Sequence, residues 1–343
     1  MAKLKDIAKM TGFSVATISR VLNHDQTFTV TDETRLIILS AAEKTNYKTL
    51  NERNLSTTNK PAPPEKKTST TVGLAYWYST TNEITDPYYL AIRLAIKEYC
   101  DLHGLELKLF YLVEDRYDEI KAAKLDGLIA LGKYSDAEIK KFRLLNQHLV
   151  LVDCYCKHLE VDVVMVDLKE ATKEIINYLN AANIYAIGFI GGVEGTLDGA
   201  TLEDRRLKTF LQYEKSNPDT IYQGSFNADS GYEIMSSIIQ SGKLQPAYIV
   251  ASDAIAIGCL KALNEHQIKV PTEVSIISYN NISLAEYTIP ALTTVDLNTH
   301  HLGTTAAQTL AERIKTNRRL GRKIFIPTQL FIRESSQPVN QQN

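Results

Sequence analysis

From residue 71 onward, short apolar runs alternate with amphipathic stretches of helical period, and this alternation is the strongest constraint on the fold. Strands that alternate with helices usually pair in parallel and are covered by helices on both faces. About nine or ten strands are expected, enough for two doubly wound α/β lobes with a ligand cleft at the carboxyl ends of the strands. The expected strands are residues 71–77, 105–112, 126–132, 149–154, 185–192, 220–226, 247–252, 274–280 and 292–297, and the expected helices are residues 88–100, 135–147, 169–180, 230–242 and 253–267.

The first 46 residues differ from this rhythm and show three short helical patterns. The first pattern ends at Gly12, and the second begins at Ser14, a good N-cap residue. The third begins at Thr31, which is followed by two acidic residues where the helix dipole favours them. Such an arrangement predicts a helix-turn-helix with a supporting helix. The side chains expected to face its core are Ile7, Ala8, Met10, Ile18, Val21, Leu22, Ile38, Ala41 and Ala42.

The stretch after Tyr47 separates these two parts of the chain. Residues 54–71 read "NLSTTNKPAPPEKKTSTT", with three prolines, many Ser and Thr residues and few apolar ones, so they should not pack a core. The expected organisation is therefore a helical headpiece over residues 1–47, a linker over 48–70, an α/β core over 71–336 and a tail over 337–343.

The second helical pattern has an unusual outer face. When its apolar stripe faces the core, Val15, Ala16 and Arg20 lie on the opposite surface. In a DNA major groove, the two small apolar residues can touch thymine methyl groups, and Arg20 can donate two hydrogen bonds to guanine O6 and N7. An ordinary surface helix of a small bundle is the alternative. The candidate DNA contacts are Ser14, Val15, Ala16, Thr17, Ser19, Arg20 and Asn23, of which Thr17, Ser19 and Asn23 suit the phosphate backbone.

The N-terminal part of the chain is net positive and the rest is net negative, which suits a headpiece that binds an acidic polymer such as DNA. Residues 1–60 hold nine Lys and Arg against six Asp and Glu, whereas residues 61–343 hold 29 against 34. No window reaches the roughly 18 to 20 consecutive apolar residues of a membrane helix, and the N-terminus lacks the apolar region of a signal peptide. We therefore expect a cytoplasmic protein without a membrane partner.

Catalytic, cofactor and metal sites are not expected. The run "GFIGG" at 188–192 lacks both the spacing of a dinucleotide-binding loop and the lysine of a P-loop. Cys154 and Cys156 lie in a buried-strand pattern rather than in zinc-like spacing, and the adjacent His300 and His301 would point apart at a helix start. A stand-alone transport protein for sugars is a further alternative, which the N-terminal helices and the absent signal peptide disfavour.

Several motifs along the chain resemble the signatures of the lactose/galactose repressor (LacI/GalR) family. They are "DIAKMTGFSVATISRVLN" at 6–23, "TNY" at 45–47, "IKVPTEVSIISYNNISLAEYTIPALTTVDLNTHHLGTTAAQTL" at 268–310 and "FIRESS" at 331–336. The resemblance covers almost the whole chain, with gaps chiefly at the linker, and it is specific because independent motifs agree in order and spacing. Within the family, the chain looks most similar to regulators of β-galactoside and galactan use.

The resemblance implies a DNA-binding headpiece, a hinge and a two-lobed core like that of periplasmic sugar-binding proteins. It implies a homodimer on a near-palindromic operator in double-stranded DNA, released by a sugar inducer between the lobes. A hinge leucine of the family enters the minor groove, and Leu55 is the candidate here. Because the surrounding sequence departs from the family pattern, Leu50 as the wedge and a plain tether without insertion stay open as alternatives. The implied lobes are residues 71–158 with 298–324 and residues 159–294 with 325–336.

The resemblance also implies which residues contact the effector. In the family's pattern, Asn-Asp and Asp-Asp stand where this chain has Ser252-Asp253 and Asn280-Asn281, so the preferred ligand is expected to differ. A different effector of purine or phosphosugar type, or a corepressor in place of an inducer, stays open. The implied effector contacts are Trp77, Asp86, Arg206, Phe226, Asp253 and Asn280.

Overall fold

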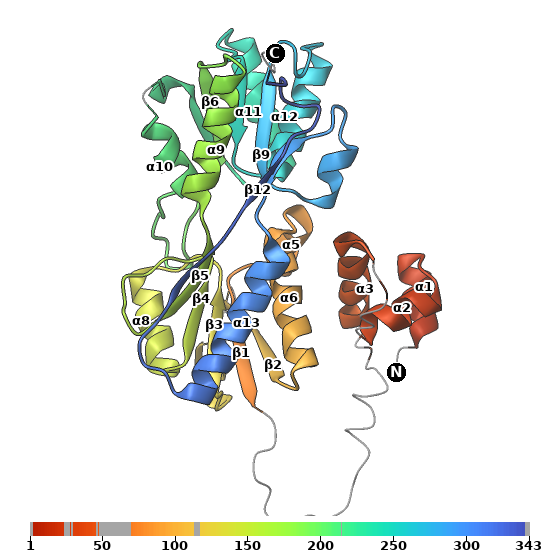
Figure 1. Ribbon diagram of the computed structural model, residues 1–343, viewed down its shortest axis with the longest axis vertical. Helices are drawn as coiled ribbons and strands as arrows, with labels where there is room; N and C mark the ends of the chain where they lie inside the picture. Colours follow the sequence, from red (N-terminus) through yellow and green to blue (C-terminus); the bar gives the residue numbers. More distant parts are fainter. Residues whose placement is uncertain are drawn as a thin grey trace, which may run out of the picture. The chain divides into compact units, whose positions relative to one another are not determined.

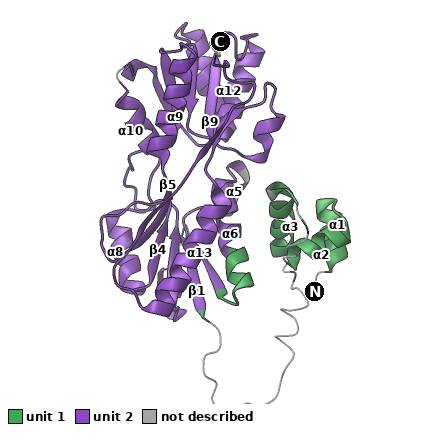
Figure 2. Cartoon of the chain, viewed as in Figure 1, with its two compact units in different colours: residues 1–70, 97–106 green, residues 71–96, 107–343 purple. Residues whose placement is uncertain are grey.

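The computed structural model describes residues 3–23, 28, 30–45, 47, 70–112, 117–213 and 215–339 (Figure 1). The chain divides into two compact units, residues 1–70 with 97–106 and residues 71–96 with 107–343 (Figure 2). The first unit carries the three N-terminal helices, and both β-sheets belong essentially to the second. Leu55 and the rest of the linker to residue 69 lie outside the described residues.

The N-terminal helices are α1 (Leu4–Thr11), α2 (Val15–Leu22) and α3 (Asp32–Lys44), which confirms the three predicted patterns. Gly12 ends α1 with a φ of 76°, a left-handed conformation that suits glycine. The Ser14 hydroxyl accepts a hydrogen bond from the backbone N–H of Thr17 at 3.1 Å and so caps α2. Thr31 caps α3 in the same way. The order of the elements is that of a helix-turn-helix.

A small apolar core holds the three helices together. Ile7, Ile18 and Ile38 contribute one fully buried side chain from each helix. Met10 was expected to face this core, but its side chain is 57% exposed. The half-buried Thr11, four residues after Ile7, lies on the inner face instead. The prediction for Met10 was therefore wrong, while those for the buried residues of α2 and α3 are confirmed.

Two six-stranded sheets form the frame of the two lobes, as the alternation of strands and helices predicts. Pairs such as β1 with β3 and β8 with β9 are parallel, whereas β12 runs antiparallel to β10. The N-terminal lobe has the order β11-β5-β4-β3-β1-β2 and the C-terminal lobe the order β12-β10-β9-β8-β6-β7. The strands are β1 (Thr71–Tyr76), β2 (Glu106–Tyr111), β3 (Gly127–Leu131), β4 (Leu149–Val152), β5 (Asp162–Val166), β6 (Ile187–Gly192), β7 (Ile221–Gly224), β8 (Ala247–Val250), β9 (Ser275–Asn280), β10 (Thr293–Asp296), β11 (Lys323–Ile326) and β12 (Gln329–Phe331).

Helices cover both sheets (Figure 1). Helix α13 packs against β3, β4 and β5 of the N-terminal lobe, and α11 packs closely against α12 in the C-terminal lobe. No helix in the described part of the chain is long and apolar enough to cross a membrane. The helices of the core are α5 (Thr80–Thr85), α6 (Tyr88–Leu102), α7 (Tyr117–Ala122), α8 (Asp136–Leu145), α9 (Leu168–Ala181), α10 (Arg205–Leu211), α11 (Ala228–Gln240), α12 (Asp253–Glu265) and α13 (Thr299–Thr316).

The lobe boundaries differ from those that we expected. Strand β5 belongs to the N-terminal sheet, although that lobe was expected to end near residue 158, and β11 belongs there up to Ile326. The reason is that no helix separates β4 from the parallel strand β5, so the alternation that predicts the other strands is interrupted. The chain therefore crosses between the lobes after β5, after β10 and after β11.

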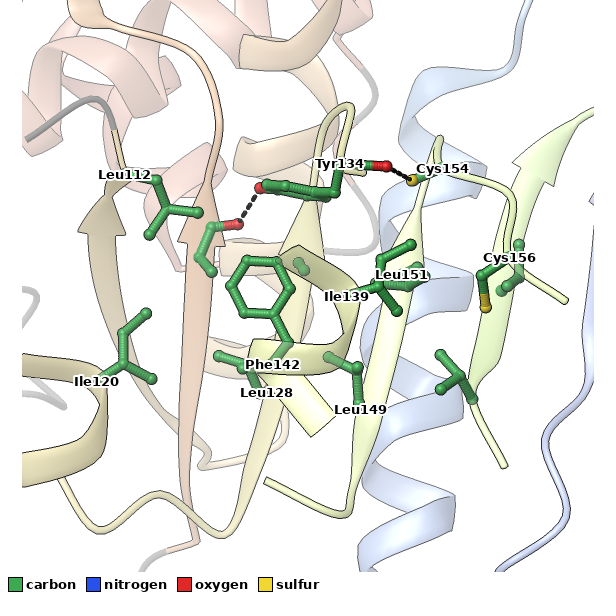
Figure 3. Packing of buried hydrophobic residues seen from close by; sticks show 14 of the residues in the cluster. Leu112, Ile120, Leu128, Tyr134, Ile139, Phe142, Leu149, Leu151, Cys154 and Cys156 are labelled. Carbon is green, nitrogen blue, oxygen red and sulfur yellow. Dashed lines mark hydrogen bonds between the residues drawn. The ribbon is translucent and has the colours of Figure 1, made fainter. Parts of the chain in front are cut away.

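The core of the N-terminal lobe includes the two neighbouring cysteines (Figure 3). Cys154 and Cys156 are free and buried among apolar side chains, as predicted, but β4 ends at Val152, so both lie after the strand rather than within it. The Cys154 thiol donates to the backbone carbonyl of Tyr134, whose hydroxyl donates to the carbonyl of Leu131 at 2.8 Å. These bonds fix the turn that follows β3.

Candidate functional site

The outer face of α2 is exposed as its sequence predicts. Ala16 and Arg20 are exposed, and the side chain of Val15 is 39% exposed. The guanidinium of Arg20 lies over the ring of Phe28, with its Cζ atom 5.0 Å from the ring centroid. A cation held over an aromatic face is restricted in its rotamers. Sequence reasoning missed Phe28, because it lies outside the three helices, where helical period gives no signal.

The polar candidates of α2 are engaged in local bonds. The Ser14 hydroxyl caps the helix and lies 2.9 Å from the Thr17 hydroxyl. The side-chain amide of Asn23 donates to the Ser19 carbonyl at 2.8 Å and to the Ser19 hydroxyl at 3.2 Å. These four residues therefore shape the two ends of the helix, with Val15, Ala16 and Arg20 exposed between them.

A cavity of ≈ 490 Å³, part of it open to solvent, lies at the carboxyl ends of strands from both sheets. Trp77 follows β1 and lines the N-terminal side, where its ring meets that of Tyr89 edge-on at 5.5 Å. Phe226 and Asn280 line the C-terminal side, after β7 and at the end of β9. Five of the six expected effector contacts line this cavity, namely Trp77, Asp86, Arg206, Phe226 and Asn280.

Asp253 does not line the cavity, contrary to expectation. It is the first residue of α12 and fully buried, and its carboxylate accepts hydrogen bonds from the hydroxyls of Ser278 and Thr294 at 2.5 and 2.6 Å. The backbone N–H of Ile282 donates to it at 2.8 Å. Burial raises the pKa of Asp253 to about 7. Its role is to tie α12 to β9 and β10, and the preceding residue, Ser252, lines the cavity instead.

Arg206 lines the C-terminal side of the cavity, and its guanidinium donates hydrogen bonds to three residues. Its Nε donates to both oxygens of Asp204 at 2.9 and 3.1 Å, and Nη1 donates to the carbonyl of Ala251 at 2.6 Å. Nη2 donates to Glu194 at 2.9 Å, and the guanidinium lies 5.3 Å from the ring centroid of Phe226. Burial alone would raise the pKa of Asp204, but the charge of Arg206 and the hydrogen bonds that Arg206 donates together outweigh it and lower that pKa.

The sequence did not predict three charged residues that line the cavity, namely Lys133, Asp153 and Glu194. Lys133 follows β3, and its Nζ lies 3.1 Å from an Asp153 oxygen and 3.4 Å from a Glu194 oxygen. Asp153 follows β4 and also accepts a hydrogen bond from the Tyr89 hydroxyl at 2.7 Å. Burial alone would lower the pKa of Lys133, but the two carboxylates outweigh it and raise that pKa. Each of the three residues stands just after a strand, and that position was the available signal.

Asp86 completes the polar lining at the end of α5. The backbone N–H of Tyr88 donates to its carboxylate at 3.2 Å, and burial raises its pKa to about 6. The cavity thus combines an aromatic wall with three lining carboxylates, Asp86, Asp153 and Glu194, and two lining cations, Lys133 and Arg206. Such a surface can exchange many hydrogen bonds with a polyhydroxy ligand.

Comparisons with known proteins agree with this architecture. The profile of "Bacterial regulatory proteins, lacI family" matches residues 3–49, and that of "Periplasmic binding protein-like domain" matches residues 176–336. The transcriptional regulator GalR of Lacticaseibacillus casei is 37% identical over 343 residues, covering 98% of this chain and 100% of that protein. The regulator GanR of Bacillus subtilis (strain 168) is 35% identical, covering 98% and 99%.

Solved structures show the same fold over nearly all of the chain. The lac repressor dimer bound to operator and an anti-inducer is 21% identical, with a TM-score of 0.69 over 98% of this chain and 99% of that one. A complex of the regulator CelR with cellobiose is 21% identical, with a TM-score of 0.68 over 98% and 100%. The relatives are regulators of transcription rather than enzymes. With a helix-turn-helix headpiece, a two-lobed core and these relatives, the chain belongs to the LacI family of bacterial transcriptional regulators.

Proposed function

We propose that this regulator is a cytoplasmic repressor that binds a near-palindromic operator as a homodimer and leaves it when a neutral galactoside binds between the lobes. The observation that carries the proposal is the pairing of charges in the cavity. Lys133 is paired with Asp153 and Glu194, and Arg206 with Glu194 and Asp204. Both cations of the described lining are therefore paired with carboxylates, and the lining offers hydroxyl-binding groups to the ligand.

The same pairing argues against an effector of phosphosugar type. A phosphate needs cations that its own charge can neutralise, and both cations of the described lining already face carboxylates. An anionic ligand would also meet Asp86 and Asp153. An uncharged sugar avoids this repulsion, and its ring can stack on Trp77 or Phe226. The resemblance of the sequence to regulators of β-galactoside and galactan use supports the galactoside class.

For operator binding, we propose that α2 enters the major groove. Val15 and Ala16 contact thymine methyl groups, Arg20 contacts a guanine, and the polar residues at the two ends of α2 face phosphates. Leu55, outside the described residues, stays a predicted minor-groove wedge. The similarity to the lac repressor dimer, which was solved bound to its operator, supports the DNA-binding role.

The dimer surface is proposed on the C-terminal lobe. Leu284, Tyr287 and Ile289 are 58%, 70% and 92% exposed and stand close together in the sequence. Large apolar side chains gathered on a surface mark contact sites between proteins, and a two-fold interface uses the same patch on both copies. A homodimer would place two headpieces on the two halves of a palindrome.

The decisive experiment measures operator binding by gel retardation while candidate effectors are titrated. Galactose, lactose and galacto-oligosaccharides are compared with galactose 6-phosphate and a purine base. We expect one of the neutral sugars to release the operator and the phosphorylated sugar to have no effect. An Arg206→Lys variant should keep operator binding and lose the response, because a lysine cannot make the forked contacts of the guanidinium. Release by the phosphosugar or by the purine would overturn the proposed effector class, and tighter operator binding would indicate a corepressor.

A further inference from the structure

The segment at residues 193–205, which we call the latch segment, connects β6 to α10 in the C-terminal lobe but contacts the N-terminal lobe. Its contacts come from the middle and both ends of the segment. They join Glu194 to Lys133 (Oε2 to Nζ, 3.4 Å), Asp198 to Ser135 (Oδ2 to Oγ, 2.5 Å) and Arg205 to Tyr155 (Cζ to ring centroid, 4.7 Å).

The latch segment folds into a short hairpin. Gly195 and Thr201 form an antiparallel bridge, and the backbone N–H of Thr196 donates to the Ala200 carbonyl at 2.9 Å. The hydroxyl of Thr196 also donates to Asp198 at 2.5 Å, and so holds the carboxylate that receives the Ser135 hydroxyl. The tip of the segment is therefore oriented toward the N-terminal lobe.

Glu194 has the central position, because its two oxygens face different lobes. Oε1 accepts a hydrogen bond from Arg206 of the C-terminal lobe at 2.9 Å, and Oε2 lies 3.4 Å from Lys133 of the N-terminal lobe. The side chains of Glu194 and Lys133 are only 12% and 13% exposed, so water screens their charges weakly. Both residues also line the cavity.

We propose that the latch segment holds the two lobes together across the cavity, with Glu194 and Lys133 as positioning residues that couple lobe closure to sugar binding. A ligand between two lobes binds fully only when they are closed, so its apparent affinity falls with the fraction of closed molecules. Removing either partner of the Glu194–Lys133 bridge should lower that fraction. The inference rests on the proposed sugar site.

The test uses the full-length protein and its single tryptophan, Trp77, as a reporter inside the cavity. Lys133→Met, Glu194→Gln and the double variant are titrated with galactose and with lactose by fluorescence. Small-angle scattering of the sugar-free proteins measures their radius of gyration. We expect each single variant to bind about tenfold more weakly and to be more expanded, and the double variant to be no weaker than the weaker single one.

Two further variants separate lobe closure from direct ligand contact. Asp198→Ala removes a latch contact at a residue outside the cavity lining, and it should also weaken sugar binding and expand the protein. Glu203→Gln breaks an exposed pair with Lys208, 2.7 Å apart, at the C-terminal end of the same segment, and should change neither quantity.

The outcomes are distinguishable. Additive losses in the double variant with an unchanged radius of gyration would mean that Lys133 and Glu194 contact the ligand independently, and the latch would be overturned. An unchanged Asp198→Ala variant would overturn it as well. A lack of fluorescence response to either sugar in the unsubstituted protein would count against the proposed function alone. In that case, expansion of the Lys133 and Glu194 variants would still support the latch, and an unchanged radius would refute it.

Discussion

At the scale of single residues, the proposed base contact of α2 depends most on Arg20, whose guanidinium lies over Phe28. Replacing Arg20 by Ala should weaken operator binding by about 1 to 3 kcal/mol and relax the preference at one base position. Fluorescence anisotropy with operators substituted base by base measures both effects. Lys9→Ala, an exposed change on α1, is the matched control. A uniform loss across all operator sequences would mean that Arg20 contacts phosphate instead.

The buried carboxylate of Asp253 leads to a second prediction, on how stability depends on pH. Its folded-state pKa of about 7 exceeds the ordinary 3.8, so the folded protein binds this proton more tightly than the unfolded chain. The free energy of unfolding should therefore fall as pH rises from about 4 to 7, by at most about 1.4 kcal/mol per pH unit. Asp253→Asn should flatten this slope, as urea denaturation at pH 5 and pH 8 would measure. An equal change in the free energy of unfolding with pH in both proteins would refute the raised pKa of Asp253.

At the scale of elements, the contact between α11 and α12 depends on two glycines. A Cβ atom on Gly258 would lie 1.9 Å from the Ala228 carbonyl oxygen, and one on Gly231 would lie 2.0 Å from that of Ile255. Gly258→Ala should therefore force the helices apart and lower the free energy of unfolding by about 1 to 3 kcal/mol or more. Urea denaturation checks this, with Gly195→Ala as the control because its nearest neighbour lies 3.8 Å away. Equal stability of the two variants would contradict the close packing.

The elements also show how far the sequence predicts the structure. Helical period, N-cap residues and alternating apolar runs predict the headpiece and most of the core. They miss the short strands β11 and β12. They also miss β5, because a strand that follows another strand without an intervening helix gives no change of period. At the cavity, strand ends and family motifs predict Trp77 and Arg206. They do not predict Lys133 and Glu194, whose pairing depends on how the two lobes meet.

At the scale of the whole molecule, operator binding should depend on the dimer. Ile289→Asp places a charge on a side chain that is 92% exposed in the chain and proposed to be buried between copies. We expect a monomer in analytical ultracentrifugation and a loss of operator affinity of at least about 100-fold, because one headpiece then binds alone. Leu144→Asp, at an 89% exposed leucine of α8, should leave both unchanged. A dimeric Ile289→Asp protein would show that the interface lies elsewhere.

The three crossings between the lobes have a consequence for the synthesis of the protein. The headpiece is contiguous and is complete once its first 47 residues have left the ribosome. Each lobe, in contrast, receives a strand from residues 323–331, β11 in one and β12 in the other. A nonsense codon just before residue 323 would therefore leave the DNA-binding helices whole while both halves of the sensor lack a strand.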